Sequence, residues 1–304
     1  MNFRHLVSAC RRAMLGCAFL CLGLAVHAQN TVVRIQTTQG SMDMTLLDSE
    51  APITVANFLA YLRGGDYVNV MFHRNAWNAT TPPTPFVIQS GGFSVSKTTG
   101  AFSVVPSRGA IQNEFSATRS NVRGTVAMAK VQHNPPQPDD PNSATSQWFV
   151  NMGNNTFLDS QNGGFTVFAR LTTPGLAVAD RIAALPNVHW NSPFDDLPLQ
   201  EWIPGQGVYV TNLVLITDTR TLTAQTSADR IFNYLEALYP QYLEPPNGDP
   251  GQALGYTFRH YSGGNVYVGI KDDQVWYLVP WIGPNPGSLG SVADWLAKAQ
   301  AAGY

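Results

Sequence analysis

A series of short blocks contains most of the residues that could do chemistry in this sequence. The blocks read FHR at 72–74, FVIQSGGF at 86–93, GTVAMA at 124–129, SATSQWFVN at 143–151, FLD at 157–159 and FTVF at 165–168. Arg74 offers a planar, permanently charged group with several donors, and the aromatic and aliphatic residues around it offer an apolar surface. Such a set favours binding and electrostatic stabilisation over covalent attack.

Residue types and spacings elsewhere exclude several other chemistries. All three cysteines lie within residues 1–28, so a chain that loses this segment can be neither a thiol enzyme nor a thiolate metal protein. The histidines at 73, 133, 189 and 260 lack close metal spacing, and neither a G-x-S-x-G elbow nor a P-loop occurs. With 18 basic against 20 acidic residues, the chain also lacks the basic footprint of a nucleic-acid-binding protein.

In their order along the chain, the blocks resemble the cyclophilin family of peptidyl-prolyl cis/trans isomerases, and its exported bacterial branch in particular. The resemblance covers residues 31–218. Each block alone is a weak signal, whereas all of them in order, with strand-like flanks, are a strong one. The resemblance implies a closed eight-stranded antiparallel β-barrel capped by two helices. It also implies rotation about the X–Pro amide without a covalent intermediate, a cofactor or a metal.

The resemblance assigns catalysis to Arg74 and Gln89. Amide rotation is slow because partial double-bond character gives a peptide bond a barrier of about 18–20 kcal/mol. In the twisted state the nitrogen regains its lone pair, so a fixed donor aimed at it stabilises that state more than either planar form. Gln89 matches the position that holds the arginine and contacts substrate, although it can equally be a buried strand glutamine. His73 is interpreted as structural, because the rotation needs no proton transfer.

The other matched residues are expected to bind substrate. Phe86, Val87, Phe149, Leu158 and Phe165 match the apolar socket for the proline ring, with barrel core as the alternative for each. Ala129 and Gln147 match the groove where backbone groups hold the substrate extended, and Phe157 replaces a tryptophan that lies near the pocket in many relatives. The missing indole argues against strong cyclosporin binding. Val87 for methionine, Lys130 for asparagine and Phe165 for histidine are the other departures, and they could reduce turnover.

The N-terminal segment reads as a secretory signal rather than as part of the fold. Residues 1–28 carry Arg4, Arg11 and Arg12, then an apolar run over 13–26 that ends in Val-His-Ala. We expect cleavage after Ala28 and a periplasmic or secreted protein without stable membrane insertion. An uncleaved anchor is the alternative, but the run is short for a span of about 20 residues. Removal of this segment leaves 15 basic against 20 acidic residues.

The elements that must position these blocks are mostly short strands. Residues 31–36 and 42–47 alternate apolar and polar, and residues 52–63 and 175–185 have helical periodicity. Further strands are expected at 67–73, 86–89, 124–130, 147–152, 166–171 and 208–217. The proline-rich stretch 132–142 is expected to be a surface loop, and residues 187–207, with two tryptophans, an ordered excursion.

A second unit follows the barrel in sequence. Residues 219–226 have the threonine-rich composition of a linker, so we expect a domain at 29–218 and a small α+β module at 227–304. The pattern predicts a helix capped by Ser227, three alternating strands at 256–261, 265–271 and 274–279, and a helix capped by Ser291. Core packing is the preferred explanation of its aromatics, with an unknown ligand as the alternative.

The sequence therefore predicts a mainly β isomerase that assists the folding of exported proteins, with proline-containing, unfolded polypeptides as partners. An alternative from a different class is a proline-peptide-binding or chaperone module on the same scaffold, with incidental isomerase activity. Turnover of a proline peptide separates the two.

Overall fold

The structure, a computed structural model, describes residues 30–131, 138–224, 226–244 and 250–304. The expected signal peptide lies outside these ranges, and so do residues 132–137 of the expected surface loop. Among the described residues, no helix combines the length and apolarity that crossing a membrane would require.

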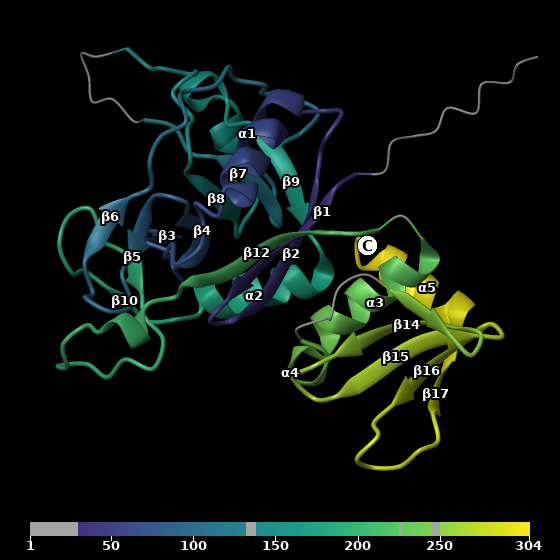
Figure 1. The fold of residues 1–304 in the computed structure, drawn as a ribbon. Coiled ribbons are helices and arrows are strands. Elements are labelled where there is room, and N and C mark those ends of the chain that lie inside the picture. Colours follow the sequence, from purple (N-terminus) through teal and green to yellow (C-terminus); the bar gives the residue numbers. More distant parts are fainter. Residues whose placement is uncertain (1–29, 132–137, 225, 245–249) are drawn as a thin grey trace, which may run out of the picture.

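An eight-stranded antiparallel sheet forms the first region (Figure 1), with the strand order β12-β1-β2-β9-β7-β8-β4-β3. The strands are β1 (Val32–Thr37), β2 (Gly40–Leu46), β3 (Arg74–Asn78), β4 (Thr84–Ser90), β7 (Thr125–Met128), β8 (Trp148–Asn151), β9 (Val167–Leu171) and β12 (Ile216–Leu222). This confirms the mainly β fold and most of the expected strands.

The expectation of a closed barrel is wrong, because β3 and β12 are the two edges of an open sheet. The gap between the edges is crossed by an isolated bridge between Met71 and Leu215. Backbone bonds flank it, from Phe72 N to Val214 O at 2.9 Å and from Ile216 N to Val70 O at 2.8 Å. Residues 67–73, expected as a strand, form turns and single bridges instead, so they cannot supply a continuous ladder.

Two helices, α1 (Pro52–Arg63) and α2 (Thr173–Ala183), pack their apolar sides into the hollow of the curved sheet, as expected. Proline lies in the first turn of each, where its missing N–H costs nothing. From α1, Phe58 packs at a tilt against Phe168 and meets the indole of Trp148 edge-on. This aromatic core makes the sheet a rigid support for the side chains on its outer face.

Strand alternation divides the residues of the sheet between two faces. On β8, Trp148 and Val150 point into the main core, whereas Phe149 belongs to a separate cluster on the outer face. The same holds on β4, where Ile88 is inside and Val87 outside. Because side chains alternate along a strand, Val87 and Gln89 of β4 and Phe149 of β8 lie on the outer face of the sheet.

The excursion 187–207 is ordered, as expected, and folds over a hairpin of β5 (Phe93–Val95) and β6 (Phe102–Val104). Phe194 packs against Phe93, Phe102 and Trp190. The strand expected at 208–217 has the wrong bounds. Residues Val210–Asn212 form a 3-10 turn, and β12 begins only at Ile216. The remaining short elements are β10 (Asn187–Val188), β11 (Leu197–Pro198) and the 3-10 turns Thr156–Asp159 and Gln161–Gly163.

The C-terminal module (residues 227–304) is larger in β-structure than expected. Its sheet has five strands in sequential order, not three: β13 (Gly251–Ala253), β14 (Tyr256–Tyr261), β15 (Val266–Lys271), β16 (Gln274–Leu278) and β17 (Gly287–Ser291). The helices are α3 (Ser227–Leu238), α4 (Pro240–Leu243) and α5 (Val292–Ala301). The two unexpected strands lie at the edges and read GQA and GSLGS, so they lack the apolar alternation that marks an internal strand.

The start of α3 and the expected linker also need correction. Thr226, not Ser227, caps α3: its hydroxyl accepts from Asp229 N at 3.1 Å, and the carboxylate of Asp229 accepts from Thr226 N at 3.0 Å. Residues 219–222, expected in the linker, belong to β12 and pair with β1 up to Val32 and Leu222. Threonine-rich composition suits an edge strand as well as it suits a linker.

Candidate active site

One row of paired residues across the sheet builds the candidate site. Arg74, the first residue of β3, lies opposite Gln89 on β4; Gln89 lies opposite Phe149 on β8; and Phe149 lies opposite Ala127 on β7. Residues directly opposite each other in antiparallel strands project to the same face. The register therefore brings a cation, an amide and an aromatic ring together on the outer face.

These residues border a cavity of about 620 Å³. Nine of the ten residues predicted from the sequence line it: Arg74, Phe86, Val87, Gln89, Ala129, Gln147, Phe149, Leu158 and Phe165. The tenth, Phe157, is half-exposed and stacks on the ring of Phe86, with 5.5 Å between centroids. Phe157 thus supports the wall from behind rather than forming it.

The apolar part of the cavity is a socket of interlocking side chains. Phe149 and Phe165 meet edge to face, with 5.7 Å between ring centroids. Leu158 and Val87 are almost fully buried beside them. The two interpretations from the sequence, a proline socket and a packed core, are compatible here. The same residues pack as a small outer core and present one face to the cavity. A socket of this kind suits a compact apolar ring.

Arg74 stands at the rim of the socket with its side chain 46% exposed. Its Nε lies 3.8 Å from the carboxylate of Asp196, in the excursion. The backbone carbonyl of Asp196 accepts a hydrogen bond from Asn75 N at 2.7 Å, and Pro193 of the same segment lines the cavity. The excursion therefore forms the wall of the site next to the free edge of β3.

The two glutamines of the site bind each other. Gln89 Nε2 donates to Gln147 Oε1 at 2.8 Å, and the backbone carbonyl of Gln147 accepts from Ala129 N at 2.9 Å. The ionic contact of Arg74 is made by Asp196, whereas the side-chain hydrogen bond of Gln89 goes to Gln147. Gln89 fixes the floor of the groove on the side of Gln147 and Ala129.

His73 is neutral at physiological pH. Burial lowers the pKa of its imidazole to about 4, and the nearby charge of Arg74 lowers it as well. The ring meets Phe93 edge-on, with 5.0 Å between centroids. These surroundings agree with the interpretation of His73 as a structural residue.

Lys130 closes the opposite end of the socket. Its ammonium donates to the carbonyls of Asn162 at 3.0 Å and Gly164 at 2.7 Å and lies 5.3 Å from the ring centre of Phe165. Partial burial lowers the pKa of Lys130 to about 8, although Asp140 and Asp139 oppose this shift. The side chain ties the segment that carries Phe165 to the end of β7.

Sequence reasoning missed several lining residues. Pro193 comes from the excursion, about 120 residues after Arg74, and only the tryptophans and prolines around it signalled an ordered segment. Asp196, the ionic partner of Arg74, comes from the same segment. Asp139 belongs to the proline-rich stretch, and Phe93 ends one of the matched blocks. In the ranges that the structure describes, no group of three or more His, Cys, Asp or Glu residues could hold a metal ion. The lining supplies apolar contact, amide groups, the rim arginine and the charged side chains of Lys130 and Asp139.

Comparisons with known proteins found one family model and several relatives. Residues 32–202 match the family model described as cyclophilin type peptidyl-prolyl cis-trans isomerase/CLD. A peptidyl-prolyl cis-trans isomerase of Acinetobacter baylyi is 34% identical over 177 residues, which are 56% of this chain and 84% of the relative. Peptidyl-prolyl cis-trans isomerase B of Escherichia coli is 33% identical over 178 residues, 56% of this chain and 96% of the relative. A cyclophilin-type isomerase structure from Cryptosporidium parvum covers 64% of this chain and 99% of its own, at 22% identity and a TM-score of 0.45.

Proposed function

This chain belongs to the cyclophilin-type peptidyl-prolyl cis-trans isomerase family, and we propose that Arg74 is the residue through which it rotates X–Pro bonds. One observation carries the assignment: the register of β3 and β4 holds the guanidinium at the rim of an apolar socket. The socket of Phe149, Leu158 and Phe165 receives the proline ring. The bond to be rotated then lies at the rim, within reach of the cation.

The proposed mechanism is differential stabilisation of the twisted amide. In both planar forms the nitrogen lone pair is delocalised, and only the twisted form presents it to a donor. A guanidinium held in place therefore binds the transition state better than either ground state, which raises the rate in both directions. The neutral imidazole of His73 takes no part, because no bond to hydrogen is made or broken.

We propose further that the isomerase acts on exported polypeptides after cleavage behind Ala28. The basic start, the short apolar run and the small residues before the cut support this, and so does the lack of cysteine in the rest of the chain. The intact mass of the protein purified from the periplasm of the host tests the proposal. A mass that retains residues 1–28 would contradict it.

The isomerase proposal is tested by turnover of a proline peptide in a protease-coupled assay. Arg74→Ala should reduce kcat/KM by about 10²–10³-fold, as the loss of one preorganised donor does elsewhere, with the fold intact. Arg108→Ala is the matched control, because Arg108 is 44% exposed and paired with Asp66 at 2.7 Å, and it is not among the residues that line the cavity. If Arg74→Ala turned over the peptide as fast as the wild-type protein, the role of Arg74 would be refuted. A wild-type protein that binds the peptide without turnover would favour the binding-module alternative.

A further inference from the structure

A buried charged cluster joins the isomerase region to the C-terminal module. Arg34 on β1 and Asp43 on β2 lie opposite each other on the outer face of the sheet, and both side chains are fully buried. Two parallel bonds connect them, from Arg34 Nε at 2.8 Å and from Nη2 at 2.7 Å. An outer-face ion pair at this position would meet water if nothing covered it.

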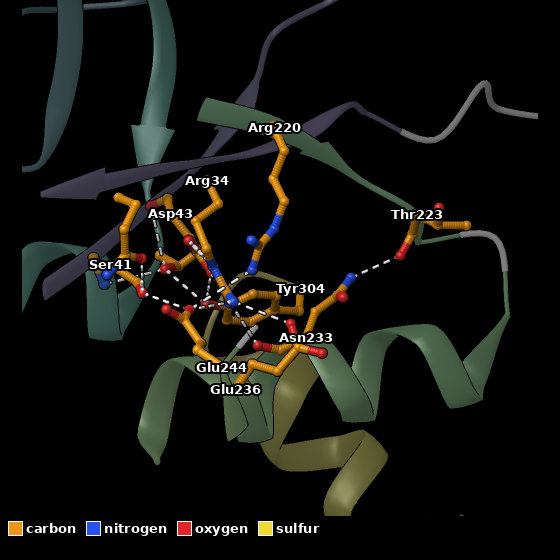
Figure 2. A network of polar contacts seen from close by, with 12 residues as sticks. Arg34, Ser41, Asp43, Arg220, Thr223, Asn233, Glu236, Glu244 and Tyr304 are labelled. Atoms are coloured by element: carbon orange, nitrogen blue, oxygen red, sulfur yellow. Dashed lines mark hydrogen bonds and ion pairs between the residues drawn. The ribbon is translucent and has the colours of Figure 1, made fainter. Parts of the chain in front are cut away.

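The other donors of Arg34 all cross to the segment that follows β12. Nη1 donates to Glu236 at 3.0 Å and to Glu244 at 3.1 Å, and Nη2 donates to the backbone carbonyl of Asn233 at 3.0 Å. All five N–H groups of the guanidinium are thus satisfied, two by Asp43 and three by the module. Figure 2 shows this arginine at the centre of the cluster, above α3 and α4.

The C-terminal module supplies further partners for the buried Glu236. Glu236, also fully buried, accepts from Arg259 Nη1 at 2.8 Å and from the hydroxyl of Tyr261 at 3.0 Å. One carboxylate thereby links an arginine of the isomerase region to an arginine of the module. A buried carboxylate is tolerated only where such partners replace water, so docking in any other position would leave Glu236 and Arg34 poorly compensated.

The C-terminal end of the chain adds contacts around the cluster. The Tyr304 hydroxyl donates to Asp43 at 2.6 Å, and burial raises the pKa of this phenol, so it keeps the proton that it donates. Thr45 Oγ1 donates to the carbonyl of Gly303 at 2.8 Å, and the backbone N–H of Thr173, at the start of α2, donates to the carbonyl of Ala302 at 2.9 Å.

An apolar patch completes the contact. It contains Val32 and Leu222 from the sheet and Ala299, Ala302 and Tyr304 from the module.

We propose that the outer face of β1 and β2 is a permanent docking surface for the C-terminal module, and that Arg34 specifies the docking position. The module is then a fixed structural part of the enzyme rather than a tethered domain. Buried ion pairs add little net stability but fix one arrangement, since each alternative leaves a charge without partners. The groove lies on β3, β4, β7 and β8, whereas the module lies beside β1, β2 and β12 (Figure 1), so docking leaves the substrate site open.

The test uses the full chain with a protease site inserted between residues 223 and 226. After cleavage, the two wild-type fragments should remain together in size-exclusion chromatography at micromolar concentration. Arg34→Lys keeps a charge but cannot make five contacts, and Glu236→Gln removes the linking carboxylate. Each should weaken fragment association by about tenfold or more. Arg220→Lys is the control: Arg220 is 28% exposed at the rim of the cluster, 3.7 Å from Glu244, and its change should matter less than about twofold.

A second measurement needs no variant, so it holds even if a buried variant fails to fold. The amide of Thr173 bonds across the interface and should exchange with solvent as slowly as the amides of β1 and β2 in the uncut protein. Fast exchange at Thr173, separation of the wild-type fragments, or equal association for Arg34→Lys and Arg220→Lys would each overturn the proposal. None of these readouts depends on isomerase activity.

Discussion

Asp196 lies 3.8 Å from the guanidinium of Arg74, although 121 positions separate the two residues in the chain. Asp196 is fixed by its own backbone, because its carbonyl accepts the N–H of Asn75, the residue after Arg74. Phe194 anchors the same segment in an aromatic cluster. The carboxylate therefore faces Arg74, the proposed catalytic residue, from a rigid support.

Removing the charge of Asp196 should lower kcat with little change in KM. Asp196→Asn keeps the shape but lets the half-exposed arginine sample other rotamers, and a loss of about two- to fivefold is expected for one exposed ion pair. Asp195→Asn is the control, since Asp195 faces His189 instead, at 3.2 Å. In an Arg74→Ala background, Asp196→Asn should have no further effect. An equal loss in both backgrounds would mean that Asp196 acts only on the fold.

Phe165→Ala should weaken peptide binding more than it slows rotation. The ring forms one wall of the socket, whereas Arg74 stays in place at the rim. We expect KM to rise by about tenfold, in line with the loss of one large apolar contact. Phe157→Ala removes a ring of the same size that lies outside the lining, so its KM should change far less. Steady-state kinetics on one proline peptide compare the two, and equal effects would contradict the position of the socket.

Lys130 should make binding of acidic peptides depend on pH. Its pKa is lowered to about 8 by burial, so the positive charge at the end of the socket is lost as pH rises from 7 to 9. A peptide with glutamate beside proline should bind about two- to fivefold more weakly at pH 9, whereas its glutamine counterpart should not change. Lys130→Met should abolish the difference. A wild-type profile that is flat between pH 7 and 9 for both peptides would contradict this.

His73 should contribute to loss of stability in acid. Its folded pKa of about 4 lies below the usual value of 6.5, so between these values the unfolded chain binds a proton that the folded chain excludes. The stability that the neutral ring contributes is fully present above about pH 6.5 and is lost as pH falls towards 4. Urea unfolding at pH 7.5 and pH 5 should show a smaller difference for His73→Asn than for wild type. His189→Asn, on the exposed excursion, should retain the wild-type difference.

Local sequence determined much of this protein. The blocks around Arg74, Gln89 and Phe149 carry their signal in a few adjacent residues. The helices at Pro52–Arg63 and Thr173–Ala183 follow from apolar spacing and proline at the first turn. These features depend on periodicity and steric preference within about ten residues, which a sequence displays directly.

Other features were decided by contacts between distant parts of the chain. The edge strands Gly251–Ala253 and Gly287–Ser291 have no alternation of their own and exist because β14 and β16 offer free backbone groups. The open sheet edge at β3 is occupied by the excursion, which brings Asp196 to Arg74. In sequence, Arg34 and Asp43 are ordinary outward-facing polar residues of alternating strands. Only docking of the module makes them a buried pair, because burial of a surface depends on what covers it. The covering residues lie far away in the chain, Glu236 at 202 positions from Arg34 and Tyr304 at 261 positions from Asp43.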